Sequence, residues 1–254
     1  MDPIIIITYL YNSGFTIDCN DTFVVIDYVQ GDLVLPKDKK IYFIVTHSHQ
    51  DHYNPAIFSM EGAEHATYFL SNDVEAIHAS ARSNILPMSD SLQRTALLKH
   101  AYDPKHTRRL KPNENFDDEG LSVHTFGSTD QGISILFRLH NINFFHAGDL
   151  NAWCWPSDPE QTREKERRDY LEILHQVSAY PIDIGFGVVD PRLGEYAFIG
   201  GEDYLDILKP QIFIPMHFRE DGEAAKTFQK EYTTKTKSMI RAVTEPGRRI
   251  IIKG

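Results

Sequence analysis

Cysteine is scarce in this chain: its 254 residues include two, Cys19 and Cys154. Two cysteines form neither a disulfide framework nor a CxxC pair at this spacing, and they fit a reducing compartment. A long apolar segment is also lacking. The first residues, MDPIIIITYLY, carry no basic stretch, and their apolar run is too short for a signal peptide or a membrane span. We therefore expect a cytoplasmic protein without a membrane span.

An excess of positive charge is lacking as well. The chain has 36 acidic and 26 Lys or Arg residues, which gives a formal net charge of −10. A net negative chain repels phosphate backbones, so nucleic acid is not an expected partner. Internal repeats at short period, low-complexity segments and Pro/Gly/Ser linkers are absent too. We therefore expect residues 1–254 to form a single domain, whose oligomeric state the sequence leaves open.

Apolar runs bounded by turn residues predict most of the secondary structure. The strands expected from these runs lie at residues 4–11, 14–19, 22–28, 41–45, 121–126, 132–138, 142–145, 182–189, 212–215 and 250–252. Asp158 is placed to cap a helix that has Pro159 in its first position, and a second helix is expected to end at residues 204–208. Strands are grouped early and alternate with helices later, which favours a mixed α/β layered domain.

Polar side chains follow three of these apolar runs. The run 41–45 leads into THSHQDH, which contains His47, His49, Asp51 and His52. In the same way, the run 142–145 leads to Asp149 and the run 212–215 leads to His217. Loops at strand ends are where rigid sheets present reactive groups. The three loops are therefore expected to face one point, although a solvated histidine-rich loop is the simpler alternative for the first of them.

This set of imidazoles and carboxylates suits Zn²⁺, and also Mn²⁺ or Fe²⁺. The absence of thiolates argues against a closed structural zinc site and favours a catalytic one. One or two such ions lower the pKa of a bound water from ~15.7 to ~7. The resulting metal-bound hydroxide attacks a carbonyl or a phosphorus atom, while the metal polarises that group.

The motifs resemble those of the metallo-β-lactamase superfamily. THSHQDH resembles its HxHxDH signature, Ala147-Gly148-Asp149 its Gly-Asp motif, and Pro215-Met216-His217 its terminal histidine. The resemblance spans nearly the whole chain and is nearest to the metal-dependent hydrolases close to the ascorbate-6-phosphate lactonases. It implies an α/β fold, a four-layer αββα sandwich of two mixed sheets flanked by helices.

The resemblance also implies how the ligands divide between two metals. His47 and His49 would hold the first metal, and Asp51, His52 and His217 the second. Asp149 would bridge the two ions. Asp51 would in addition act catalytically, because a carboxylate near the metal-bound water can orient it or relay its proton.

One position departs from the family pattern. The family places a further ligand histidine in a GHTPG-like segment, and this chain has GSTDQG, with Ser128 at that position. A neutral serine is a poor ligand. Asp130 supplies an oxygen instead, or His124 supplies a nitrogen, or the first metal is weakly bound or missing. The second metal is therefore expected to bind more tightly than the first.

Other residues near these motifs have two interpretations each. Arg192 offers a fork for a substrate carboxylate or phosphate, or it pairs with Asp190 or Glu195. Trp153, like Trp155, forms a wall of a substrate pocket or packs in the core. His146 is interpreted as a hydrogen-bonded neighbour of the ligands.

The function expected from the whole sequence is that of a metal-dependent hydrolase. Its substrate is a small, anionic lactone, phosphodiester or amide, among which the ligand set does not choose. One alternative is a degenerate relative that binds metal or ligand without turnover, which Ser128 supports. A nuclease would need a basic groove or an added module. The flavin-linked di-iron relatives usually carry Glu at the position of His49.

Overall fold

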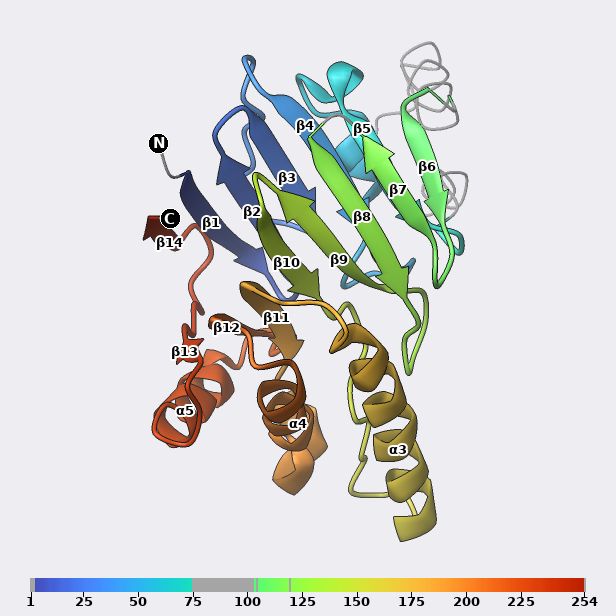
Figure 1. The fold of residues 1–254 in the computed structure, drawn as a ribbon, viewed down its shortest axis with the longest axis vertical. Coiled ribbons are helices and arrows are strands. Elements are labelled where there is room, and N and C mark those ends of the chain that lie inside the picture. The colour runs from blue at the N-terminus through green and yellow to red at the C-terminus, as the bar shows by residue number, and fades with distance from the viewer. Residues whose placement is uncertain (1–2, 75–102, 104, 119, 254) are drawn as a thin grey trace.

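The computed structural model describes residues 3–74, 103, 105–118 and 120–253. Two seven-stranded sheets form the centre of this described part (Figure 1). The N-terminal sheet has the order β14-β1-β2-β3-β4-β5-β6. Its strands are β1 (Ile4–Tyr11), β2 (Gly14–Cys19), β3 (Thr22–Ile26), β4 (Lys40–Val45), β5 (Thr67–Ser71), β6 (Thr107–Leu110) and β14 (Arg249–Lys253).

The C-terminal sheet has the order β13-β12-β11-β10-β9-β8-β7. Its strands are β7 (Asn115–Asp118), β8 (Leu121–Phe126), β9 (Ser134–Leu139), β10 (Ile142–His146), β11 (Ile184–Val188), β12 (Ile212–Met216) and β13 (Met239–Ile240). The helices are α3 (Glu160–Val177), α4 (Ile199–Leu208) and α5 (Gly222–Tyr232), with 3₁₀ turns η1 (Pro55–Phe58), η2 (Ala63–His65) and η3 (Pro191–Tyr196).

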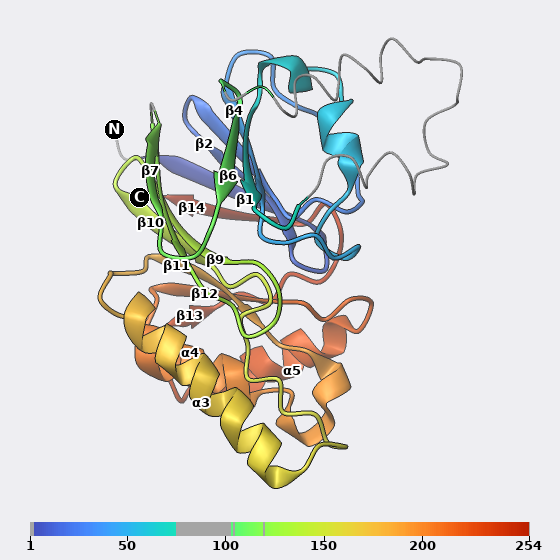
Figure 2. The ribbon, with the colours of Figure 1, turned by 90° about the vertical axis from the view of Figure 1, so that its right-hand side faces the viewer.

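Both sheets are mixed in the same way. Strands β14, β1, β2 and β3 pair antiparallel, and β3 to β6 pair parallel. Strands β7 to β10 pair antiparallel, and β10 to β13 pair parallel. Helices α3, α4 and α5 cover the C-terminal sheet, and η1 and η2 lie beside the N-terminal one (Figure 2). The predicted pair of mixed sheets flanked by helices is confirmed.

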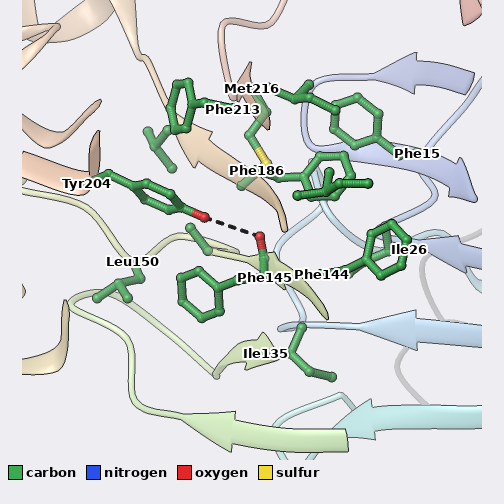
Figure 3. Close-up of a cluster of buried hydrophobic side chains, with 14 of the residues drawn as sticks. Phe15, Ile26, Ile135, Phe144, Phe145, Leu150, Phe186, Tyr204, Phe213 and Met216 are labelled. Carbon is green, nitrogen blue, oxygen red and sulfur yellow. Dashed lines mark hydrogen bonds between the residues drawn. The ribbon is translucent and has the colours of Figure 1, made fainter. Parts of the chain in front are cut away.

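The main core lies between the two sheets (Figure 3). Phe15 of the N-terminal sheet meets Phe186 of the C-terminal sheet, with ring centroids 4.8 Å apart. Strand β4 is buried on both faces, as predicted, because Tyr42 and Ile44 face this core while Phe43 packs in a second cluster on the other side. A strand buried on both faces reads as a continuous apolar run.

A few element boundaries differ from the prediction. Helix α3 begins at Glu160, so Pro159 occupies the cap position expected for Asp158, and no side chain caps the helix. Strands β5, β6, β7 and β13 and helix α5 lie where no element was predicted. Among the described residues, no helix combines the length and the apolar character needed to cross a membrane.

Candidate metal centre

Five strands end at one edge of the sandwich. Strands β3 and β4 are parallel neighbours in one sheet, and β10, β11 and β12 are parallel neighbours in the other. The carboxyl ends of parallel neighbours lie together, so the loops that follow them converge. These loops carry Asp27 after β3, residues 47–52 after β4, Asp149 after β10, Asp190 after β11 and His217 after β12.

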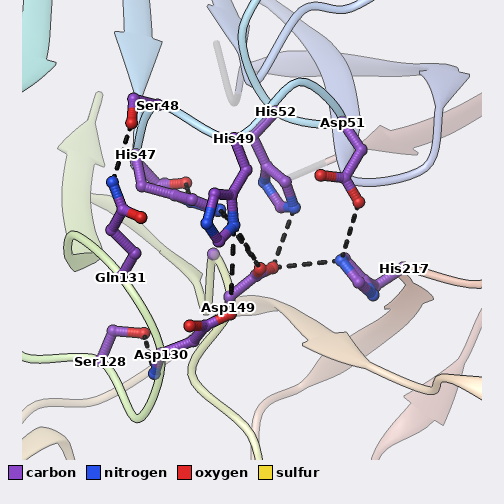
Figure 4. A network of polar contacts seen from close by, with 12 residues as sticks. His47, Ser48, His49, Asp51, His52, Ser128, Asp130, Gln131, Asp149 and His217 are labelled. Carbon is purple, nitrogen blue, oxygen red and sulfur yellow. Dashed lines mark hydrogen bonds and ion pairs between the residues drawn. The ribbon is translucent and has the colours of Figure 1, made fainter. Parts of the chain in front are cut away.

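Asp149 lies at the centre of the cluster and is almost fully buried (Figure 4). Its Oδ1 is 2.9 Å from His52 Nε2 and 3.2 Å from His217 Nε2. Its Oδ2 is 3.2 Å from His47 Nε2 and 3.8 Å from His49 Nδ1. The three predicted loops therefore do face one point, and the two carboxylate oxygens point to different sets of histidines.

The cluster can be divided at Asp149. We call Asp51, His52 and His217 the inner group; their potential ligand atoms all lie within 4.8 Å of one another. We call His47, His49 and Asp130 the outer group. His49 and Asp130 form a comparable set with Asp149, and His47 forms one with His52 and Asp149.

Three buried atoms at the centre lack a hydrogen-bond partner among the described residues: His52 Nε2, Asp149 Oδ1 and His217 Nε2. They face one another at 2.9 and 3.2 Å without the angles of a hydrogen bond. Leaving buried polar atoms unpaired is costly. Ligands of a tetrahedral zinc ion at 2.0–2.1 Å are about 3.3 Å apart. These atoms therefore fit a shared cation.

The electrostatics of the cluster favour positive charge at its centre. Burial alone would raise the pKa of Asp149, but the neighbouring His52 and His217 hold it well below its usual range. Burial alone would lower the pKa of His52, but the charge of Asp149 raises it to about 10. The pKa of His217 is raised for the same reason, against the effect of burial. A divalent cation held here would supply the positive charge that this arrangement favours.

Buried carboxylates orient both inner histidines. His52 Nδ1 is 2.8 Å from Asp27 Oδ2, and His217 Nδ1 is 3.0 Å from Asp190 Oδ2. Asp27 is fully buried and also accepts hydrogen bonds from the main-chain N–H and the hydroxyl of Thr46. Such partners fix the ring and its tautomer, and here they leave Nε2 of both histidines facing Asp149. Sequence reasoning missed both of these roles.

The outer group is held differently. His47 Nδ1 lies 3.1 Å from the hydroxyl of Thr46, and His49 Nδ1 lies 4.0 Å from Asp130 Oδ2. The side chains of His49 and Asp130 are 41 % and 46 % exposed, respectively. Ser128 is hydrogen-bonded to the main-chain N–H of Asp130. This loop therefore brings Asp130 towards His49, close enough for its carboxylate to serve as the alternative ligand that the sequence offers.

His124, the other alternative, lies elsewhere. Its imidazole is hydrogen-bonded to Asn115 and packs against Phe126 and Tyr180, with ring centroids 4.5 and 4.9 Å away. It belongs to none of the clusters of potential ligands in the described part of the chain. The prediction of a His124 ligand is wrong because His124 lies on β8 with its ring directed towards Asn115 of the neighbouring strand β7.

His146 has both ring nitrogens in hydrogen bonds. Nδ1 accepts from the main-chain N–H of Gly148 at 3.1 Å, so Nε2 donates to the Ser13 carbonyl at 2.9 Å. Burial lowers its pKa, which favours this neutral form. His146 thus supports the turn before Asp149 and is absent from the ligand sets, as predicted.

Asn12 connects the loop that carries Asp51 to the loop that carries His217. Its place in a predicted hairpin turn did not indicate this role. It is fully buried. Its carbonyl accepts from His217 N–H, and its side-chain amide donates to the Asp51 carbonyl at 3.3 Å. Its Oδ1 accepts from Arg219 N–H. The first turn of the chain therefore holds two distant loops together.

A cleft of about 980 Å³ opens beside Asp149. Its wall includes Trp153 and Trp155, whose rings stack at 6.0 Å with an interplanar angle of 9°. Trp153 is nevertheless only 7 % exposed, and its indole N–H donates to the Asp149 carbonyl. Trp153 thus packs in the core and lines the cleft at once.

Arg192 also lines the cleft. Its Nε is 2.9 and 3.0 Å from the two oxygens of Asp190, so the predicted ion pair with Asp190 is present. Its guanidinium lies over the ring of Trp155, 5.4 Å from the centroid. Arg192 is therefore tied to His217 through Asp190 while part of its side chain stays open to the cleft.

Comparisons with known proteins agree with this fold. No family model matches the sequence, and no curated protein matches it. Among solved structures, a metallo hydrolase of the archaeon Ignicoccus hospitalis is similar, with a TM-score of 0.61 and 14 % identity over 99 % of each chain. The metallo-β-lactamase fold protein YhfI of Bacillus subtilis is similar with a TM-score of 0.61 and 11 % identity, over 99 % of this chain and 100 % of that one.

A third similar structure is CmlA, a diiron β-hydroxylase of Streptomyces venezuelae, with a TM-score of 0.61 and 12 % identity. The match covers 99 % of this chain and 54 % of CmlA. The chain therefore has the metallo-β-lactamase fold, which its neighbours use for metal-dependent chemistry of more than one kind.

Proposed function

We propose that residues 1–254 form one metal-dependent hydrolase domain that acts on a small molecule. The observation that carries this proposal is the set of three buried, unpaired atoms on His52, Asp149 and His217, which face one another at the edge of an open cleft. Buried unpaired polar atoms cost free energy unless a ligand satisfies them. Asp27 and Asp190 bind the far ring nitrogens of the two histidines, as carboxylates behind metal-binding histidines do.

The residues divide into roles by position. The inner group and Asp149 would hold one ion, and His47, His49 and Asp130, again with Asp149, a second. Zn²⁺ suits these ligands, and Mn²⁺ or Fe²⁺ suits them as well. When bound, such an ion supplies a water of lowered pKa and polarises the group under attack.

Asp51 is the residue proposed for proton handling. Its carboxylate is 3.6 Å from His217 Nε2 and lines the cleft, where 26 % of its side chain is exposed. A carboxylate there can orient an attacking water or accept its proton. Trp153 and Arg192 are proposed to contact the substrate, since both line the same cleft.

The proposed substrates are lactones, phosphodiesters and amides of small size, as in the lactonase-like branch of the superfamily. The cleft volume is within the range typical of small-molecule sites. A panel of chromogenic esters, lactones, phosphodiesters and β-lactams, assayed with Zn²⁺ and Mn²⁺, tests this. We expect turnover of at least one class, abolished by a chelator and restored by metal.

A non-catalytic metal-binding relative is the second candidate, because His49 and Asp130 of the outer group are exposed and Ser128 replaces the expected histidine. Protein that demonstrably holds metal but shows no chelator-sensitive turnover of any compound in the panel would favour this second candidate over the hydrolase.

A further inference from the structure

Two arginines lie on the cleft wall beside the inner group. Arg192 belongs to η3, which follows β11, and Arg219 comes two residues after His217 at the end of β12. Because β11 and β12 are parallel neighbours, the loops that follow them lie side by side. Both arginines also line an adjoining cavity of about 550 Å³. They therefore lie at the junction of two open spaces.

The guanidinium of Arg192 is fixed in place. Asp190 binds its Nε and Nη2, and the Trp155 ring lies beneath its plane. Its Nη1 donates no hydrogen bond to any described residue, and 38 % of the side chain is exposed. An arginine held in this way loses little side-chain entropy when it binds a further acceptor.

Arg219 is fixed at its main chain and open at its tip. Its N–H donates to Asn12 Oδ1, and its φ of 51° lies in the left-handed region. Its Nη2 is 3.1 Å from Asp51 Oδ2, while 48 % of the side chain is exposed. Within the described part of the chain, its Nε and Nη1 are without hydrogen-bond acceptors.

We propose that Arg192 and Arg219 together bind an anionic group of the substrate, a carboxylate or a phosphate, next to the inner group. This inference rests on the proposed function, because the anion belongs to the molecule to be hydrolysed. Arginine forks match carboxylate and phosphate oxygens geometrically.

The rest of the cleft limits the size of this anion. Asp130, Asp158 and Glu166 also line it. These carboxylates repel a polyanion that runs through the cleft. The substrate class is therefore a compact molecule with one anionic end at the arginines and a neutral or cationic end towards Glu166.

Arg219 also links anion binding to metal binding. Its partner Asp51 is a proposed ligand of the inner group, so arginine and cation share one carboxylate. A cation bound to Asp51 weakens the hold of that carboxylate on Arg219 and leaves the guanidinium charge for the anion. Each ligand then strengthens the binding of the other, because such coupling is reciprocal.

Calorimetry with inorganic phosphate and with succinate, on protein of verified zinc content, tests the site and separates the two kinds of anion. We expect at least one of them to bind, and Arg219→Gln to weaken that binding about tenfold or more, the size of a lost charge-assisted contact. Arg219→Lys should retain part of the affinity. Arg241→Gln, at an exposed arginine that lines neither cavity, should retain all of it.

Zinc affinity provides the second readout. Because Arg219 competes for Asp51, Arg219→Gln should bind Zn²⁺ at least as tightly as the wild type. A weaker zinc affinity would mean that Arg219 merely positions Asp51, and it would overturn the proposal. So would phosphate and succinate affinities of Arg219→Gln within twofold of the wild type, or no binding of either anion to the zinc-loaded wild type.

These outcomes are distinct from failure of the hydrolase proposal. Arg219-dependent anion binding without turnover of any compound in the panel would remove the hydrolase and leave the anion site. Metal-dependent turnover with Arg219-independent anion binding would remove the anion site alone.

Discussion

The possible ligands on the two sides of Asp149 differ in their burial and in the groups that orient them. His52 and His217 are buried, and each is oriented by a buried carboxylate. On the other side His49 and Asp130 are exposed, and His47 is oriented by a hydroxyl. Preorganised ligands lose less entropy when they bind an ion, so the inner group should bind metal first. His49 and Asp130 of the outer group are also open to the cleft.

The largest effect is expected where both sides meet. Asp149→Ala removes the carboxylate that faces both groups, and we expect loss of tightly bound metal from both, together with all hydrolysis. His52→Ala should remove the inner metal and activity in the same way. Metal analysis and circular dichroism check that metal is lost from a folded chain. Full turnover by either variant would refute these ligand assignments.

A smaller effect is expected when the supports of the inner group change. Asp27→Asn and Asp190→Asn leave the ligands in place but weaken their orientation, which should lower the affinity of the inner group for its metal about 10- to 100-fold. Competition with a chromogenic chelator measures this. Asp21→Asn is the matched control, since it alters another Asp–His pair, Asp21 with His140, away from the cluster. If both variants bound metal with unchanged affinity, the buried carboxylates would not explain why the inner group should bind metal before the outer group.

A substitution beside the outer group should strengthen metal binding there. Wild-type protein purified without added zinc should contain one tightly bound ion, and two equally tight equivalents would count against the comparison. Ser128→His restores the expected imidazole, and we expect the ion of the outer group to bind roughly tenfold more tightly. Ser178→His, at the exposed end of α3, is the control. Equilibrium dialysis against buffered Zn²⁺ gives both affinities.

The smallest effect is expected from the hydroxyl that orients His47. Thr46→Val retains the shape of the side chain but removes the hydrogen bonds to His47 and Asp27. The expected loss in affinity for the metal of the outer group is below about tenfold, because the bond to His47 is a single neutral hydrogen bond, which contributes about 1 kcal/mol. An effect as large as that of Asp27→Asn would show that the outer group depends equally on its support. The chelator competition used for Asp27 measures it.

The sequence predicted the fold through strands that read as plain apolar runs, such as residues 41–45, and the site through polar residues directly behind them. The contacts of Asp27 with His52 and of Asp190 with His217 were missed because a carboxylate at a strand end does not reveal which imidazole it faces. Their roles are visible only once β3 and β11 are placed beside β4 and β12.

Local chemistry also failed to choose between His124 and Asp130. Both lie near Ser128 along the chain, but β8 turns His124 towards Asn115, whereas the loop turns Asp130 towards His49. The direction of a side chain depends on the sheet around it. A short-range sequence pattern carries no information about that sheet. The same holds for Asn12, whose partners are up to 207 residues away.

The contacts of Asn12 have a consequence for biosynthesis. Asn12 is translated about 200 residues before His217, yet its carbonyl accepts a hydrogen bond from the His217 N–H. β1 likewise acquires its neighbour β14 only from the last residues described. A nascent chain therefore cannot close the inner group until the loop after β12 has left the ribosome, so strands β1 to β11 alone do not complete the proposed ion site.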